Sequence, residues 1–148
     1  MNFKEKDLKI LQLLKEDSKR TVKEIARELD TPPSTVHDRI QKMNSEGLIK
    51  QWTIVPDYAM MGKPITAFVL AKYVHAEGRS QRKVAEEIAK LENVHEVHIV
   101  TGTWDLLIKA RVSSVEELSN LTVDKLSEMK GVGERVTITS LSKAKEER

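Results

Sequence analysis

The segment Thr21–Ile49 most constrains the fold, because it predicts two short helices joined by a tight turn. Thr21 and Glu24 form the capping-box pattern T-x-x-E at the start of the first helix. Apolar residues then recur at helical spacing, namely Val22, Ile25, Ala26 and Leu29. The turn at Asp30–Pro32 ends this helix, and Pro33 suits the first position of the next, where the N–H that proline lacks would be unpaired anyway.

The second helix of this pair has a narrow apolar stripe and a spare polar face. The stripe consists of Val36, Ile40 and Met43, and Gly47 is placed to end the helix. The polar side chains need no core, and they are Ser34, Thr35, Asp38, Gln41, Lys42 and Ser45. A further helix with a wide apolar face is predicted before the pair, at Asp7–Leu14. A helix that buries one stripe and exposes such a face has the form of a DNA-reading element.

The second half of the chain changes to a β-rich pattern after a Gly/Pro-punctuated connector at 56–64. Strands are predicted at 65–74, 94–100, 104–112 and 135–141, with helices after the caps Ser80 and Ser114. The inner face of the second helix is assigned to Val115, Leu118, Leu121, Leu126 and Met129, and Gly131 and Gly133 are predicted to end this helix. The order β-α-β-β-α-β predicts an α+β, ferredoxin-like domain with both helices on one face of an antiparallel sheet. The uncovered face of the sheet predicts a dimer.

These patterns predict three regions. Residues 1–50 form a helix-turn-helix DNA-binding domain, 51–64 a strand linker or hinge with 48–55 extended, and 65–148 a ferredoxin-like dimerisation domain. No cysteine is present, which excludes disulfides, thiolate zinc sites and cysteine nucleophiles. The sequence shows no run of about 18 apolar residues and no secretory leader, so we expect a cytoplasmic protein without a membrane partner.

The net charge of the whole chain is +2, which excludes a polycation that coats nucleic acid indiscriminately. Residues 1–50 hold 11 Lys and Arg against 9 Asp and Glu, so the excess lies in the first third. DNA affinity must therefore come from placing cations on one surface.

The order of these motifs resembles the Lrp/AsnC, or feast/famine, family of regulators over nearly the whole chain. The resemblance rests on DLKILQLLKED, IARELDTPPSTVHDRIQKM, the exit EGLI, VTGTWDLLIKARV and the closing GVGERVTIT. It implies a winged helix-turn-helix, a C-terminal RAM domain that dimerises and often assembles further to tetramers or octamers, and an amino acid or related small molecule as effector. Two positions depart from the family pattern. Pro32 stands where Ser commonly caps the recognition helix, and Thr103 stands where the effector turn commonly has Asp.

The candidate DNA-binding residues lie on and before the second helix of the pair. Ser34, Thr35, Asp38 and Lys42 are predicted to contact base edges and phosphates, against the alternative of a solvated helix face. Arg39 is either a phosphate clamp or half of an internal salt bridge, and His37 lies at the edge of the face. Cations and free backbone N–H groups at Lys19, Arg20, Thr21 and Lys23 could meet a phosphate, with a solvated charge run as the alternative.

The candidate effector site is the turn at Gly102, Thr103 and Asp105. Its backbone N–H groups could meet an effector carboxylate at a subunit interface, whereas a plain hairpin that requires glycine is the alternative. No cofactor, catalytic residue or metal site is predicted. His95 and His98 are three apart in a strand and would project to opposite faces, so they cannot easily share one ion. Surface or interface positions are expected for these two histidines and for His75.

Two other classes of function stay open at this point. One is a sirohaem decarboxylase-like enzyme on the same scaffold, in which the histidines could serve. The other is an architectural DNA-binding protein without an effector, which the departure at Thr103 supports. Trp52 is predicted to be a hinge or dimer anchor rather than a platform for base stacking.

Overall fold

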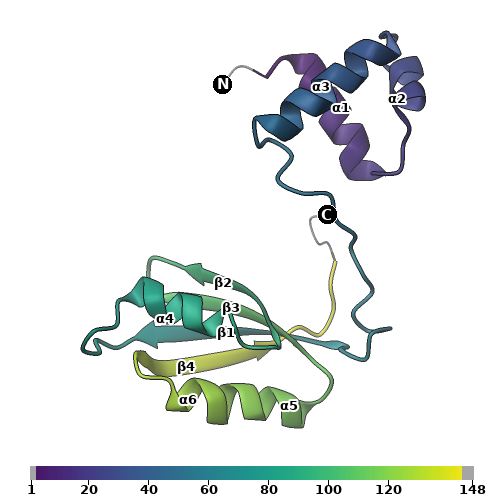
Figure 1. Cartoon of the computed structure of the whole chain (residues 1–148). Helices are drawn as coiled ribbons and strands as arrows, with labels where there is room; N and C mark the ends of the chain where they lie inside the picture. The colour runs from purple at the N-terminus through teal and green to yellow at the C-terminus, as the bar shows by residue number, and fades with distance from the viewer. Residues whose placement is uncertain (1–2, 145–148) are drawn as a thin grey trace. The chain divides into compact units, whose positions relative to one another are not determined.

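The computed structural model describes residues 3–144, which form two compact units that divide between Val55 and Pro56 (Figure 1). This division falls inside the linker segment 51–64. No helix of the described residues is long and apolar enough to cross a membrane.

The N-terminal unit consists of three helices around one apolar core. They are α1 (Glu5–Glu16), α2 (Val22–Glu28) and α3 (Pro33–Ser45). Each helix contributes fully buried side chains to the core, among them Ile10 from α1, Ile25 from α2, and Val36 and Met43 from α3. The predicted tri-helical unit is confirmed.

The predicted caps explain where α2 and α3 begin and end. Thr21 Oγ1 accepts the Glu24 N–H at 3.3 Å, and Glu24 Oε2 accepts the Thr21 N–H at 2.7 Å, which completes the capping box. Pro33 occupies the first position of α3, and its neighbour Pro32 gives no side-chain cap. Gly47 ends the helix with a φ of +77°, a conformation that favours glycine.

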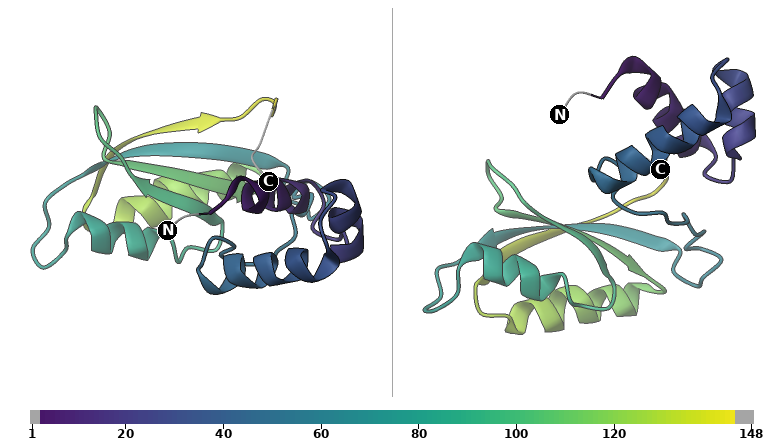
Figure 2. Two further views of the ribbon diagram at one scale, coloured as in Figure 1. Left: turned by 90° about the horizontal axis from the view of Figure 1, so that it is seen from above. Right: turned by 45° about the horizontal axis from the view of Figure 1, so that its top comes forward.

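The C-terminal unit is a four-stranded antiparallel sheet in the order β2-β3-β1-β4. The strands are β1 (Ile65–Tyr73), β2 (Val94–Ile99), β3 (Leu106–Val112) and β4 (Val132–Thr139). Helix α4 (Gln81–Ile88) and the helical run α5 (Val115–Ser119), η1 (Asn120–Lys125) and α6 (Leu126–Glu128) lie on the same face of the sheet (Figure 2). The predicted β-α-β-β-α-β fold is confirmed.

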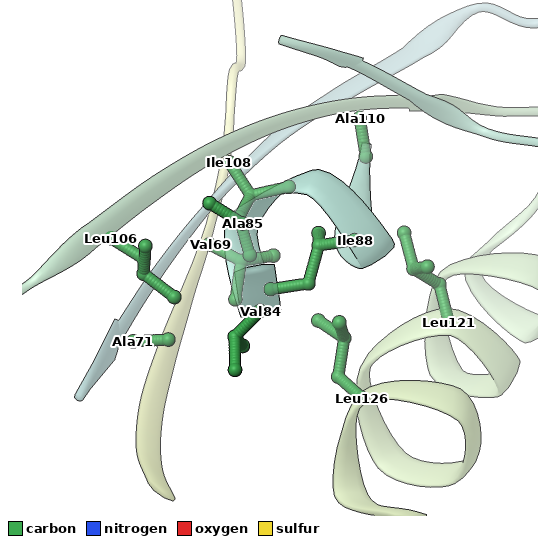
Figure 3. Close-up of a cluster of buried hydrophobic side chains, with 10 residues drawn as sticks. All are labelled: Val69, Ala71, Val84, Ala85, Ile88, Leu106, Ile108, Ala110, Leu121 and Leu126. Atoms are coloured by element: carbon green, nitrogen blue, oxygen red, sulfur yellow. The ribbon is translucent and has the colours of Figure 1, made fainter. Parts of the chain in front are cut away.

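The core of this unit lies between the sheet and the helices. Alternate residues of β1 and β3 point toward α4 and the second helical run, as Figure 3 shows for Val69 and Ile108, which pack with Ile88 of α4. These three side chains are fully buried. The residues between them along the strands therefore face the side of the sheet that carries no helix.

The second helical run differs from the predicted regular helix. A π-helical turn, η1, interrupts it, and the Leu126 N–H donates to the carbonyl of Leu121, five residues earlier. This turn brings Leu121 and Leu126 into the same core, although five residues do not complete a whole number of α-helical turns. Val115 was predicted to face inward, but it is 73% exposed because it lies in the first turn of α5, beyond the core.

Two other predictions are wrong in detail. The segment 48–55, predicted to be extended and to lead into a strand linker, is not part of any strand in the structure. β4 begins at Val132 rather than Arg135, so Gly133 lies inside the strand instead of ending the helix. A Cβ at Gly133 would meet Val74 Cγ2 at 2.5 Å, and the glycine therefore permits close approach of the chain at this point.

Candidate functional site

The polar face of α3 lies at the surface of the N-terminal unit, as predicted. Ser34, His37, Asp38, Gln41, Lys42 and Ser45 are exposed, and Thr35 is half-buried. The apolar stripe on the other side fixes this orientation, because Val36 and Met43 are fully buried. The helix thus offers hydroxyl, amide, carboxylate and ammonium groups together on one side, the groups with which proteins contact base edges and phosphates.

Arg39 forms the internal salt bridge that was one of its two predicted roles. Its Nη1 lies 2.7 Å from Asp7 Oδ1, and the Asp7 carboxylate is buried at the start of α1. Burial opposes ionisation of Asp7, but the Arg39 hydrogen bond, the Lys4 N–H and the charges of Arg39 and Lys42 together hold its pKa below the usual range. The ion pair joins α1 to α3 and helps to fix how α3 is turned.

The other ionisable side chains of α3 are His37, Asp38 and Lys42, and each lies near a group close to it in the sequence. His37 Nδ1 lies 3.5 Å from Asp38 Oδ1, and Lys42 Nζ lies 3.8 Å from Glu46 Oε1. All of these side chains except that of Glu46 are more than half exposed, and exposed pairs contribute little to stability. They remain available for other contacts at small cost.

The cluster before α2 is less uniform than its sequence predicts. Arg20 is paired with Glu28 and lies 3.8 Å from Glu16, whereas Lys19 is exposed, and its backbone N–H donates to Asp17. Thr21 is committed to its capping box. Of the predicted phosphate contacts in this cluster, Lys19 and Lys23 therefore have the accessible charges.

The turn between α2 and α3 forms a hollow of about 420 Å³ that sequence reasoning did not find. It is lined by Lys23 and Arg27 of α2, by Asp30 and Thr31 of the turn, and by the two prolines. Lys23 and Arg27 are four residues apart, so they lie on one face of α2. This spacing in the sequence could have indicated that Arg27 lies beside Lys23 as a further cation of this surface.

The predicted effector turn lies between β2 and β3. Gly102 has a φ of +119°, which strongly favours glycine, and a Cβ there would meet nothing within 4 Å. Asp105 has a structural partner, since its Oδ2 accepts the Tyr73 N–H at 2.8 Å beside the irregularity in the pairing of β1 with β4. Gln81, at the start of α4, donates to the carbonyl of Asp105 at 3.1 Å. Thr103 is exposed at the tip of the turn.

The histidines do not form a metal site in the described residues 3–144, where no group of three His, Asp or Glu side chains could hold an ion. The pairing of β2 with β3 shifts between Val94 and Glu96, so His95 lies at a bulge. This bulge interrupts the alternation on which the prediction of opposite faces rests. His95 packs edge-on against Tyr58, and His98 Nε2 lies 3.3 Å from Glu96.

Comparison with known proteins identifies both units. Residues 66–148 match the model of the Lrp/AsnC ligand binding domain, and residues 3–50 match that of a winged helix-turn-helix DNA-binding domain. The chain belongs to the Lrp/AsnC family of transcriptional regulators. It is therefore a DNA-binding regulator with a ligand-binding domain, and not an enzyme such as a sirohaem decarboxylase.

Individual proteins also match this chain over nearly their whole length. An uncharacterized HTH-type transcriptional regulator of Pyrococcus abyssi is 43% identical over 141 residues, which cover 95% of this chain and 94% of the relative. Bacillus subtilis LrpC is 26% identical, with a TM-score of 0.84 and coverage of 98% and 99%. The Neisseria meningitidis regulator NMB0573, solved as a complex with L-Met, shares the fold at 22% identity and a TM-score of 0.92, with coverage of 99% and 94%.

Proposed function

We propose that this Lrp/AsnC regulator reads specific DNA sequences with the exposed face of α3 while two copies are joined through their C-terminal units. The observation that carries the proposal is the orientation of α3, whose polar residues face solvent while Val36 and Met43 lie in the core. Hydroxyl and carboxylate groups near the start of the helix discriminate bases, and Lys42 adds a phosphate contact. Asp38 either accepts a hydrogen bond from a cytosine amino group or pairs with His37.

Two substitutions on α3 separate base reading from phosphate binding. Lys42→Ala removes one cation, so it should weaken binding to all duplexes and lower the slope of log affinity against log salt by about one. Ser34→Ala leaves the charge unchanged and should alter the preferred sequence. Both affinities are measured by fluorescence anisotropy on selected and on random duplexes. Equal losses on both duplexes for both variants would exclude base reading by α3.

The face of the sheet without helices supports the proposed dimer. The apolar side chains on this face are Phe68, Leu70, Leu107, Val136 and Ile138, which lie beside one another in the strand register. Val136 is 42% exposed and Ile138 50%, so β4 presents apolar side chains to solvent on this face in the single chain, although Lys109 lies opposite Phe68 on the same face. A second copy would cover it with the same surface in a two-fold arrangement.

A charge on this face tests the dimer. Val136→Glu should convert the dimer to a monomer in light scattering at micromolar concentration, because a carboxylate buried in an apolar interface is not compensated. Val123→Glu places the same charge on η1, where Val123 is 61% exposed and faces away from the sheet surface. It should leave the mass unchanged. A wild-type protein that is monomeric would contradict this part of the proposal.

An amino acid or similar small molecule is the proposed effector, bound near Gly102, Thr103 and Asp105. The family assignment of a ligand-binding domain supports it, and the L-Met complex of the Neisseria protein is an example within the same fold. Since Asp105 already bonds to the Tyr73 N–H, backbone N–H groups of the turn are the main candidates for an effector carboxylate.

Scanning fluorimetry against the twenty amino acids tests this assignment. A ligand at 100 times its dissociation constant adds about 2.7 kcal/mol of stability, which is an easily measured shift. Thr103→Asp restores a carboxylate that could bind an effector ammonium, and it should strengthen the response. No shift for any amino acid with either protein would favour an architectural DNA-binding protein without this effector.

A further inference from the structure

The turn Asp57–Lys63, which follows the division between the two units, is held to the C-terminal unit near both its ends. The Tyr58 ring lies over the Arg111 guanidinium of β3, with 3.9 Å between the guanidinium carbon and the ring centre. The same ring meets His95 edge-on, with centres 4.9 Å apart. At the other end, Lys63 Nζ donates to Asn93 Oδ1 at 3.0 Å.

The residues that receive this turn are themselves fixed. Arg111 and Asn93 are both buried, and the Arg111 N–H donates to the carbonyl of Asn93 at 2.9 Å. Asn93 Nδ2 donates to Glu117 Oε1 at 2.9 Å, and Glu117 in turn accepts the Ser113 N–H at 2.6 Å. Lys63 and Tyr58 therefore rest on a network that joins β3 to α5.

The turn is also ordered internally. The Lys63 N–H donates to the carbonyl of Tyr58 at 2.8 Å, and the Ala59 N–H donates to Asp57 Oδ1 at 2.9 Å. Gly62 has a φ of +79°, which glycine adopts at no steric cost. This segment is folded back on itself and does not extend the reach of the chain.

Residues 50–56 have a different character. They belong to no helix or strand, and in the part of the chain that the structure describes their only hydrogen bond joins the Thr53 hydroxyl to the neighbouring carbonyl of Ile54. Ile49, just before them, lies in the N-terminal core, and its N–H donates to Met43. These seven residues therefore connect the N-terminal core, at Ile49, to the anchored turn at Asp57–Lys63, and they form the tether between the two units.

We propose that Tyr58 and Lys63 are positioning residues for DNA binding, because they fix the point at which the tether leaves the C-terminal unit. The inference rests on the proposed dimer, in which each copy carries one DNA-binding unit on such a tether. Without its two side-chain anchors the turn is held only by its internal hydrogen bonds and can open, and the tether then lengthens from residues 50–56 to residues 50–64. Since effective concentration falls as about the −3/2 power of tether length, the advantage of a second half-site should fall about threefold.

The test compares full-length protein on a duplex with two half-sites and on the same duplex with one half-site scrambled. The readout is the dissociation constant on the single-site duplex divided by the dissociation constant on the two-site duplex. Tyr58→Ala combined with Lys63→Ala should lower this ratio about threefold, with single-site affinity unchanged. Tyr58→Phe keeps the ring, and Met60→Ala alters the same turn at a side chain that is 87% exposed. Both controls should match wild type.

Each other outcome has a separate meaning. A double variant with the wild-type ratio would overturn the positioning role, and so would equal losses on both duplexes, which indicate general destabilisation. A wild-type protein without any two-site advantage would instead overturn the dimer on which the inference rests.

Discussion

Replacing Arg39 by methionine tests whether this arginine works inside the N-terminal unit or at the DNA surface. The substitution keeps a long, flexible side chain but removes the charge that lies 2.7 Å from the buried Asp7 carboxylate. Asp7 then retains the Lys4 N–H, which donates to it at 2.7 Å, and the more distant charge of Lys42. A buried carboxylate without its main partner is costly.

The expected loss of unfolding free energy is about 2–3 kcal/mol at pH 7. Removing one partner of a fully buried pair typically costs about 3–5 kcal/mol. The value here should be lower, because the Arg39 side chain is 23% exposed and the Lys4 hydrogen bond remains. In so small a unit, each kcal/mol corresponds to roughly 4–8 °C in the midpoint of thermal unfolding.

The loss should depend on pH in a defined direction. In the wild type, Arg39 lowers the pKa of Asp7 in the folded protein. The stabilisation by this ion pair is therefore present above the pKa that Asp7 has in the unfolded chain, and it is lost as pH falls through the pKa in the folded protein. In Arg39→Met the main cause of the lowering is absent and burial raises the pKa instead. The difference between wild type and variant should therefore shrink as pH falls from the raised pKa of the variant to the lowered pKa of the wild type, below which the carboxylate is protonated in both.

Urea unfolding followed by the NMR amide signals of α1 and α3 measures this difference. Asp7→Asn combined with Arg39→Met removes the uncompensated charge, and it should be less destabilised than the sum of the two single variants by about 0.5–3 kcal/mol. Additive effects, or a loss that does not change with pH, would refute the reasoning. DNA binding gives a second readout: the salt slope should stay unchanged, whereas a phosphate contact by Arg39 would lower it by about one.

Three further predictions concern the C-terminal unit. Gly131→Ala should destabilise this unit by about 1–3 kcal/mol in thermal unfolding, because the added Cβ would lie 2.7 Å from Val84 Cγ2 and the φ of +99° disfavours alanine. An unchanged unfolding free energy would contradict this packing. Burial and the charges of Arg111, Lys63 and Lys109 lower the pKa of His95, against the opposing effect of Glu96. Stability should therefore rise with pH from the folded value up to about 6.5, and His95→Gln should remove this rise in a pH series of urea unfolding. Asp105→Ala should lower the unfolding free energy by about 1–3 kcal/mol and speed hydrogen exchange of the Tyr73 amide, because this amide loses its carboxylate acceptor. A Tyr73 amide as protected as in the wild type would disprove this role of Asp105.

The sequence predicts the helices of the N-terminal unit well because their signals are local. The capping box at Thr21, the proline at the start of α3 and the glycine after it each act within one turn of helix. The strict alternation of β3 is equally local, since every second side chain from Leu106 to Val112 is buried.

Two of the features that sequence reasoning missed, the roles of Gly133 and Arg39, depend on residues far apart in the chain. Gly133 looks like a helix terminator, but its role is to let β4 approach Val74 closely. The π-helical turn has one signal in the sequence, which is the five-residue spacing of the apolar residues Leu121 and Leu126, because a regular α-helix does not place such a pair on one face. Arg39 could not be assigned from sequence because its partner, Asp7, lies 32 residues away.

The accessible face of α3 is the basis of this account, and site-specific photocross-linking tests it most directly. The photoreactive residue p-benzoylphenylalanine replaces Gln41 on α3 or Gln12 on α1, two exposed glutamines of the same unit. With a selected duplex, the Gln41 variant should cross-link to DNA while the Gln12 variant does not. Cross-linking from Gln12 but not from Gln41, at equal DNA occupancy, would contradict the account.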